Sequence, residues 1–184
     1  MLHKYGFKEL SLYCYRTGGV ITQLAAQIYG YRDHSTQKFA HDLGVASQLA
    51  HLLCQLRPSL EQNRLYLPEE DLRHFHVEEE PLLHFENSAQ FKQLMDFQLQ
   101  RIEEYQQRAM RALPDEDRYA QLPHLILLSL QLTMLREIAG DGWALLQQKT
   151  ALTPLRKLWL SWKTVGAEKQ RQRKYLARQP EKHI

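Results

Sequence analysis

The chain has 184 residues, of which 43% are hydrophobic and 24% charged, which is enough for one sizeable domain and too apolar for a disordered chain. Its two cysteines, Cys14 and Cys54, lie far apart, which excludes a disulfide framework and a clustered zinc motif and favours a reducing compartment. There is no apolar run of about 18 residues and no signal-peptide pattern at the N-terminus, so we expect a cytoplasmic protein.

The net charge of +3 is unevenly distributed along the chain. Residues 156–184 hold nine Lys or Arg and two Asp or Glu, a net charge of +7, whereas residues 1–155 have a net charge of −4. The exposed basic candidates near the C-terminus are Lys169, Arg171, Arg173, Lys174 and Arg178. They could bind anionic lipid headgroups and place the protein at the periphery of the inner membrane, or they could form a solvated tail. No aromatic residues alternate with these charges, so we expect no nucleic-acid partner.

Apolar residues recur at helical spacing in almost every long segment, and no segment alternates convincingly as a strand would. We expect long helices over 7–29, from Ser35 to the region of Pro58, over 88–113, over 118–139 and from Pro154 onward, with a short helix after Pro68. Ser35 and Ser88 are the expected N-caps. The segment Leu125–Leu135 is apolar on nearly all sides, which predicts a central helix.

Three local features leave alternatives open. Gly18-Gly19 inside the first helix indicates either close approach of a neighbour or a break. Pro58 is expected to end or shift its helix, because an interior proline costs about 3 kcal/mol. Asp115-x-Asp117 lies in a turn and is expected to cap the following helix. We divide the chain into a helical domain over 1–167 and a loose basic tail over 168–184.

Five motifs occur in an order typical of one family. They are Tyr-Cys-Tyr-Arg-Thr-Gly-Gly (13–19), Leu-Gly-Val-Ala-Ser-Gln-Leu (43–49), Arg-Leu-Tyr-Leu-Pro (64–68), Leu-Pro-Asp-Glu-Asp-Arg (113–118) and the segment 149–159. Together they resemble the squalene/phytoene synthase family, most nearly its bacterial presqualene diphosphate branch. The resemblance implies an all-α fold, namely the C-terminal portion of an isoprenoid-synthase helical bundle, and head-to-head joining of two farnesyl diphosphates.

The family's metal-binding motif is altered in this chain. In relatives an Asn-x-x-Arg-Asp-x-x-x-Asp run holds Mg²⁺, which prefers carboxylate oxygens and neutralises the departing diphosphate. The corresponding positions here are His51, Cys54, Gln55 and Ser59. The family's first Asp-rich motif has no counterpart in the sequence. We therefore expect no bound Mg²⁺ and no catalysis by this chain alone.

Other positions of the family's cavity are retained. Tyr13 matches a tyrosine that handles a proton or stabilises a cation in relatives, although a core tyrosine is an equal alternative. Four further residues are candidates for substrate contact: Gly19, Gln48, Arg64 and Tyr66. Gln48 could instead be a buried, hydrogen-bonded amide, Arg64 and Tyr66 could pin their loop to the bundle, and Gly19 could permit close helix packing.

These observations lead to three functional hypotheses. The first is a pseudoenzyme or partner subunit that forms a homodimer or hetero-complex through an uncovered apolar face. The second is an active prenyltransferase completed by another polypeptide. The third is a module that binds the membrane surface. The pair His74 and His76 could hold a metal, but it lacks an obvious third ligand and suits a solvated turn.

Overall fold

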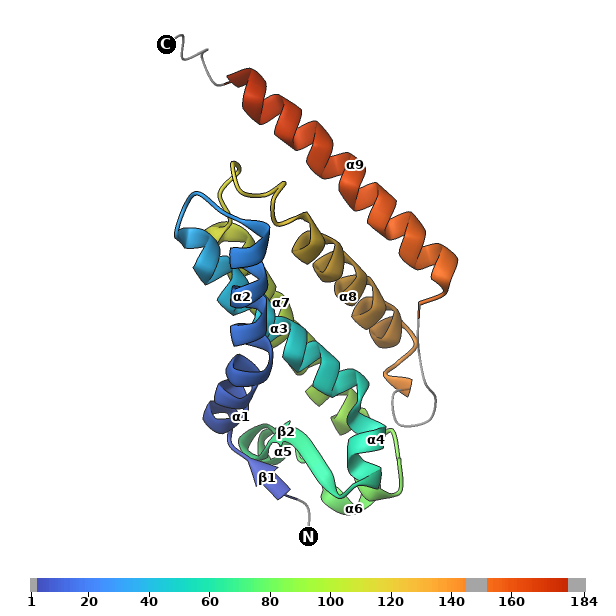
Figure 1. Ribbon diagram of the computed structural model, residues 1–184. Helices are drawn as coiled ribbons and strands as arrows, with labels where there is room; N and C mark the ends of the chain where they lie inside the picture. The colour runs from blue at the N-terminus through green and yellow to red at the C-terminus, as the bar shows by residue number, and fades with distance from the viewer. Residues whose placement is uncertain (1–2, 145–151, 179–184) are drawn as a thin grey trace.

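A computed structural model describes residues 3–144 and 152–178, and these residues are almost entirely helical (Figure 1). In chain order the elements are β1 (His3–Tyr5), α1 (Phe7–Cys14), η1 (Tyr15–Gly19), α2 (Val20–Tyr29), α3 (Ser35–Cys54), α4 (Leu56–Glu61), β2 (Arg64–Pro68), α5 (Glu69–His74), α6 (Glu79–Leu83), α7 (Ala89–Ala112), α8 (Leu122–Gly140) and α9 (Pro154–Arg178). The all-α class expected from the sequence is confirmed.

Helix α3 organises the bundle. It packs against α7 along one side and against α1, η1 and α2 along another, while α8 and α9 lie beyond it (Figure 1). One core cluster surrounds the C-terminal half of α3 and includes Leu53, Phe91 and Ile102. A second cluster, around Phe39 and Leu43, fills the end where α3 begins. The small elements from α4 to α6 gather at the opposite end.

The helix predicted over 7–29 is present, and its glycines carry a π-helical turn, η1, rather than a break. The turn inserts one residue into the helical repeat, as π-turns do inside longer helices. Gly30 ends the segment with φ of +82°, a left-handed value that favours glycine.

The predicted caps are half right. Ser88 caps α7, because its Oγ accepts a hydrogen bond from the backbone N–H of Phe91 at 3.1 Å. Ser35 does not cap α3; it is the first helical residue, and its own N–H donates to Asp33 Oδ1 at 2.8 Å. The carboxylate of Asp33, two residues upstream, therefore accepts a hydrogen bond at the start of α3, where the Ser35 hydroxyl was the expected acceptor.

The two strands are the main elements that the sequence did not predict. β1 and β2 form a short parallel pair in which His3 aligns with Arg64 and Tyr5 with Pro68. Segment 64–68, expected to lie in a loop, forms β2, and residues 79–83, which lie in none of the expected helices, form α6. A pairing between segments some 60 residues apart leaves no local periodic signal.

The C-terminal helices also differ from expectation. Helix α8 begins at Leu122, four residues later than predicted, because the residues before it form turns. It is not central: Leu127 is exposed, and within the described residues α9 covers one of its sides. Helix α9 continues to Arg178 instead of loosening at 168, and Glu168 anchors it through an ion pair with Arg118 at 2.6 Å. Residues 179–184 of the expected tail lie outside the described residues.

Candidate functional site

A close helix crossing lies at the centre of the candidate site. A Cβ atom on Gly44 of α3 would lie 2.6 Å from the Cα of Gly19, and one on Gly18 would lie 2.5 Å from the carbonyl oxygen of Gly44 and 2.9 Å from the Cβ of Gln48. Real Cβ atoms do not approach so closely, so the two backbones meet only because Gly18 and Gly44 are glycine. The Cα of Gly19 lies at this crossing, but a Cβ on Gly19 would meet the Tyr15 ring of its own segment, at 2.7 Å. Contact of Gly19 or Gln48 with substrate stays a prediction.

Three tyrosine rings from β1, β2 and α1 form a column. Tyr66 of β2 stacks on Tyr5 with ring centroids 6.0 Å apart and on Tyr13 of α1 with centroids 5.7 Å apart. Burial, and then the neighbouring Tyr66 phenol, raise the pKa of Tyr13 above its usual value. Tyr13 therefore stays protonated at neutral pH and can donate a hydrogen bond. The alternative that Tyr13 is a core tyrosine is wrong, because its side chain is exposed.

Sequence reasoning missed Tyr5. The residue joins the column because β1 pairs with β2, and that pairing is long-range. The stack also shows what Tyr66 does in the fold. Its ring holds the 64–68 segment against α1, which is the packing role considered for it as an alternative to substrate contact. Arg64 begins β2 with an exposed side chain, and no ion pair within residues 3–144 and 152–178 involves it. Its contact with a phosphate therefore stays a prediction.

The altered metal motif lies at the C-terminal end of α3. The backbone N–H of Gln55 donates to His51, and that of Ser59 donates to Gln55, each at 3.0 Å. These three residues therefore follow one another along successive turns, as a ligand-bearing helix face would require. The helix nevertheless breaks at Gln55, and α4 starts at Leu56 with Pro58 in its first turn. Pro58 has no N–H to offer the carbonyl of Cys54, which explains why α3 ends there.

The donor set at this end does not fit Mg²⁺. Gln55 and Ser59 supply neutral oxygens, and burial raises the pKa of the Cys54 thiol to about 11, so that it is not an anionic ligand. The nearest carboxylate along the chain, Glu61, pairs with Arg57 at 3.2 Å. Over residues 3–144 and 152–178 no group of three or more His, Cys, Asp or Glu side chains could hold a metal ion. That finding includes His74 and His76, both of which are exposed.

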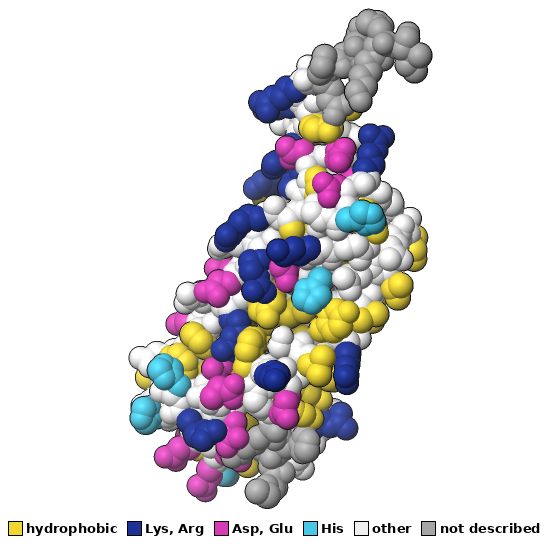
Figure 2. Space-filling model, turned by 90° about the vertical axis from the view of Figure 1, so that its left-hand side faces the viewer, with side chains coloured by type: hydrophobic (Ala, Val, Ile, Leu, Met, Phe, Trp, Pro, Cys, Tyr) yellow, Lys and Arg dark blue, Asp and Glu magenta, His cyan; other side chains and the backbone are white. Residues whose placement is uncertain are grey.

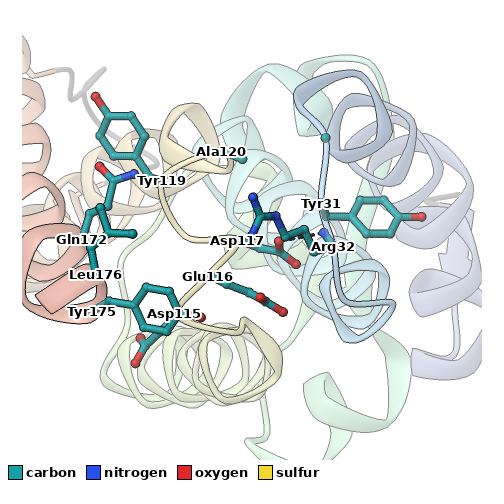
Figure 3. Close-up of a pocket in the computed structure, with 11 residues that line it drawn as sticks. Tyr31, Arg32, Asp115, Glu116, Asp117, Tyr119, Ala120, Gln172, Tyr175 and Leu176 are labelled. Carbon is teal, nitrogen blue, oxygen red and sulfur yellow. Dashed lines mark hydrogen bonds between the residues drawn. The ribbon is translucent and has the colours of Figure 1, made fainter. Parts of the chain in front are cut away.

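The cavity shown in Figure 3 lies at the other end of α3, one helix length or about 30 Å away. It has a volume of about 370 Å³ and is bounded by the α2–α3 loop, the turn before α8 and the C-terminal part of α9. None of the predicted site residues lines it. Figure 3 shows Tyr119, Tyr175 and Leu176 on the α9 side and Asp117 facing the α2–α3 loop.

The acidic residues of this cavity have structural roles. Asp117 is buried and accepts hydrogen bonds from the backbone N–H groups of Arg32 and Asp33, at 2.7 and 3.0 Å, and from the Thr36 hydroxyl at 2.7 Å. The prediction that it caps the following helix is wrong, because its carboxylate binds the α2–α3 loop and the Thr36 hydroxyl, and α8 has no side-chain cap hydrogen bond. Asp115 pairs with Arg171 of α9 at 2.9 Å. Asp117 is thus directed into the fold, whereas Asp115 and Glu116 are exposed.

Solved structures share this arrangement of helices. YisP from Bacillus subtilis superposes with a TM-score of 0.78 at 25% identity, over 88% of this chain and 65% of that one. A dehydrosqualene synthase superposes with a TM-score of 0.67 at 19% identity, over 92% of this chain and 60% of that one. Squalene synthase HpnC from Alicyclobacillus acidocaldarius gives 0.66 at 18% identity, over 77% of this chain and 54% of that one. The fold is therefore that of the all-α isoprenoid synthases.

The sequence narrows this class to one family. Residues 5–157 match the family model for squalene/phytoene synthase. The 15-cis-phytoene synthase of Synechocystis is 30% identical over 167 residues, which cover 84% of this chain and 50% of the relative. That of Synechococcus elongatus is 25% identical over 164 residues, covering 83% and 53%. The chain belongs to the squalene/phytoene synthase family.

The chain spans about half the length of the curated relatives that it matches. The activity of a whole synthase therefore does not transfer directly to it. These relatives are phytoene synthases, and the narrower resemblance to the presqualene diphosphate branch stays a prediction. Lys149 and Thr150, which contributed to that resemblance, lie outside the described residues.

Proposed function

We propose that this chain is a non-catalytic member of the squalene/phytoene synthase family that serves isoprenoid metabolism, of the squalene or hopanoid type, as a partner subunit. The supporting observation is the donor set at the end of α3. Gln55 and Ser59 stand where relatives carry the carboxylates that hold Mg²⁺, and the nearby thiol of Cys54 is neutral. Without a bound cation, the negative charge of the diphosphate group is not neutralised, so this leaving group departs slowly from the prenyl chain.

The partner role rests on an exposed apolar surface on α1 and α2, which we term the α2 face. Its large hydrophobic side chains are between 36% and 83% exposed: Leu12, Val20, Ile21, Leu24, Ile28 and Tyr29. Figure 2 looks onto this side and shows hydrophobic side chains gathered across the middle of the molecule, with charged residues on either side. Ile21, Leu24 and Ile28 follow helical spacing, so they form one stripe. A stripe of this kind fits a helix from a second copy or from another polypeptide.

The association is tested by sedimentation velocity of the full chain, alone and over a range of concentrations. We expect a self-associating species if the partner is a second copy, and conversion to monomer in the variant I21S/I28S. If the partner is another polypeptide, the chain alone stays monomeric but binds an apolar reporter dye, and I21S/I28S lowers that dye binding. The variant K169A/R173A on α9 is the control, because it removes no apolar side chain and leaves the α2 face intact.

A monodisperse monomer that binds no dye would contradict the partner role. The active alternative, a prenyltransferase completed by another polypeptide, is favoured by Tyr13, Gly19 and Tyr66, which keep the residues of the family's motifs. It predicts presqualene diphosphate or squalene from farnesyl diphosphate once that polypeptide is added, which product analysis with and without Mg²⁺ would detect.

A further inference from the structure

The outer side of α9 carries a second apolar surface, distinct from the α2 face. Leu155, Leu158, Trp159 and Trp162 share one side of this helix and are between 54% and 79% exposed. The helix instead buries Leu160 and directs Glu168 to Arg118. Two tryptophans and two leucines within eight residues form a contiguous apolar patch, which a solvent-facing helix rarely carries without a binding partner.

Basic residues continue this same side of the helix toward the C-terminus. Eleven residues make about three helical turns, so Lys169 lies within about 20° of Leu158 around the axis, and Arg173 lies equally close to Trp162. One side of α9 is therefore apolar toward its N-terminal end and basic toward its C-terminal end. Lys163 lies at its margin, with Nζ 5.1 Å from the centre of the Trp159 ring.

The charges on α9 are almost all of one sign. Its eight basic residues are Arg156, Lys157, Lys163, Lys169, Arg171, Arg173, Lys174 and Arg178, and its one acidic residue, Glu168, is paired with Arg118. Arg156 pairs with Glu137 and Arg171 with Asp115. Within the described part of the chain, Lys169, Arg173, Lys174 and Arg178 take part in no ion pair. A second copy of α9 would bring the same positive charge, so electrostatics disfavours a homodimer through this helix.

We propose that α9 is an interfacial helix that binds an anionic lipid surface. Leu155, Leu158, Trp159 and Trp162 insert at the boundary between headgroups and acyl chains, where the indole ring has an apolar body and a polar N–H. Lys169 and Arg173, on the same side, meet the lipid phosphates. Arg171, a candidate from the sequence, is held by Asp115 instead. None of the helices described is long and apolar enough to cross a bilayer, so this contact is with the surface.

The proposal does not depend on the proposed partner role, because it uses a different surface. It is tested with the full chain and vesicles of phosphatidylcholine alone or of equal parts phosphatidylcholine and phosphatidylserine. We expect sedimentation with the anionic vesicles only, weakened by high salt. Tryptophan emission should shift to the blue on binding, because Trp159 and Trp162 are exposed in the free protein while Trp143 is already buried.

Two pairs of variants separate the contributions. K169A/R173A removes two charges and should lower partitioning roughly thirtyfold, at about 1 kcal/mol per charge, whereas the control K8A/K38A removes two exposed charges elsewhere and should change nothing. W159S/W162S should abolish the emission shift and the sedimentation, whereas I21S/I28S should preserve both. Each variant changes exposed side chains, and circular dichroism checks its fold.

Three results would overturn the proposal. The first is absence of binding to either vesicle by the unaltered chain. The second is binding that survives both α9 variants. The third is conversion of an oligomer to monomer by W159S/W162S without vesicles, which would assign the patch to a protein partner.

Discussion

His124 lies in the core cluster around Phe39, with its Nδ1 2.9 Å from Gln121 Oε1 and the rings of Tyr29 and Phe39 beside it. The Gln121 amide nitrogen donates to the carbonyl oxygens of Ala26 and Gly30, at 3.3 and 2.9 Å. The amide oxygen therefore faces the imidazole, and His124 must carry its proton on Nδ1. Burial lowers the pKa of His124 to about 4, so the ring is neutral in the folded state at physiological pH.

This pKa predicts how stability depends on pH. An unfolded histidine titrates near 6.5, so the unfolded state binds the extra proton first as the pH falls. The contribution of His124 is complete above pH 6.5 and is lost between pH 6.5 and 4, amounting to about 3 kcal/mol. Urea unfolding at pH 7 and pH 4.5 measures it. The variant H124N, which can still donate to Gln121, should lose less stability over this interval; equal losses in both proteins would contradict the account.

At the scale of elements, the crossing of α3 with the η1 turn sets how closely the two segments pack. Gly18 and Gly19 sit on the π-helical turn, which rotates the glycine side of the helix toward Gly44. Because the nearest atoms at this crossing belong to the backbone, a side chain cannot be accommodated by a simple rotamer change.

We therefore predict that G44A lowers the free energy of unfolding by about 1–3 kcal/mol, the usual cost of overpacking. The matched control is G166A on α9, where no atom lies within 4 Å of an added Cβ. There alanine should raise stability by about 0.5–1 kcal/mol, since glycine is a poor helix former. Denaturant unfolding compares the two variants. Equal effects would show that the crossing is looser than the glycine contacts imply.

The contrast between elements also shows what the sequence could predict. The helices over 7–29 and 88–113 follow from their apolar periodicity, and the Ser88 cap follows from its chemistry. The β1–β2 pair, the role of Tyr5 and the binding of Asp117 to the α2–α3 loop all depend on residues distant in sequence. Apolar periodicity predicted the helix from Pro154 onward, but it could not tell that Leu158, Trp159 and Trp162 face outward, because burial is decided by the neighbouring elements.

For the candidate site, the chemical identity of the motif residues was more informative than the periodicity of apolar residues. The substitution of Gln55 and Ser59 for carboxylates is visible in the sequence, and so is the proline that breaks the helix after Cys54. The neutral state of the Cys54 thiol required the structure, since it results from burial. The cavity beside Asp117 could not be expected, because three separate segments form it.

At the scale of the whole molecule, the chain spans about half the length of its curated relatives and exposes two apolar surfaces. The α2 face suits another polypeptide, and the outer side of α9 suits an anionic membrane. The two surfaces respond to different variants, so each proposal can fail without the other. Both are compatible with a protein that acts near isoprenoid substrates without carrying out the ionisation step.

We infer that no carboxylate pair at the end of α3 recruits Mg²⁺ to a prenyl diphosphate. The decisive experiment follows the release of inorganic pyrophosphate from farnesyl diphosphate against Mg²⁺ concentration, with the full chain. We expect the same rate with and without the protein at every Mg²⁺ concentration. A release rate that rises with protein and saturates with Mg²⁺, and that a control protein does not reproduce, would show instead that this end of α3 is a working metal site.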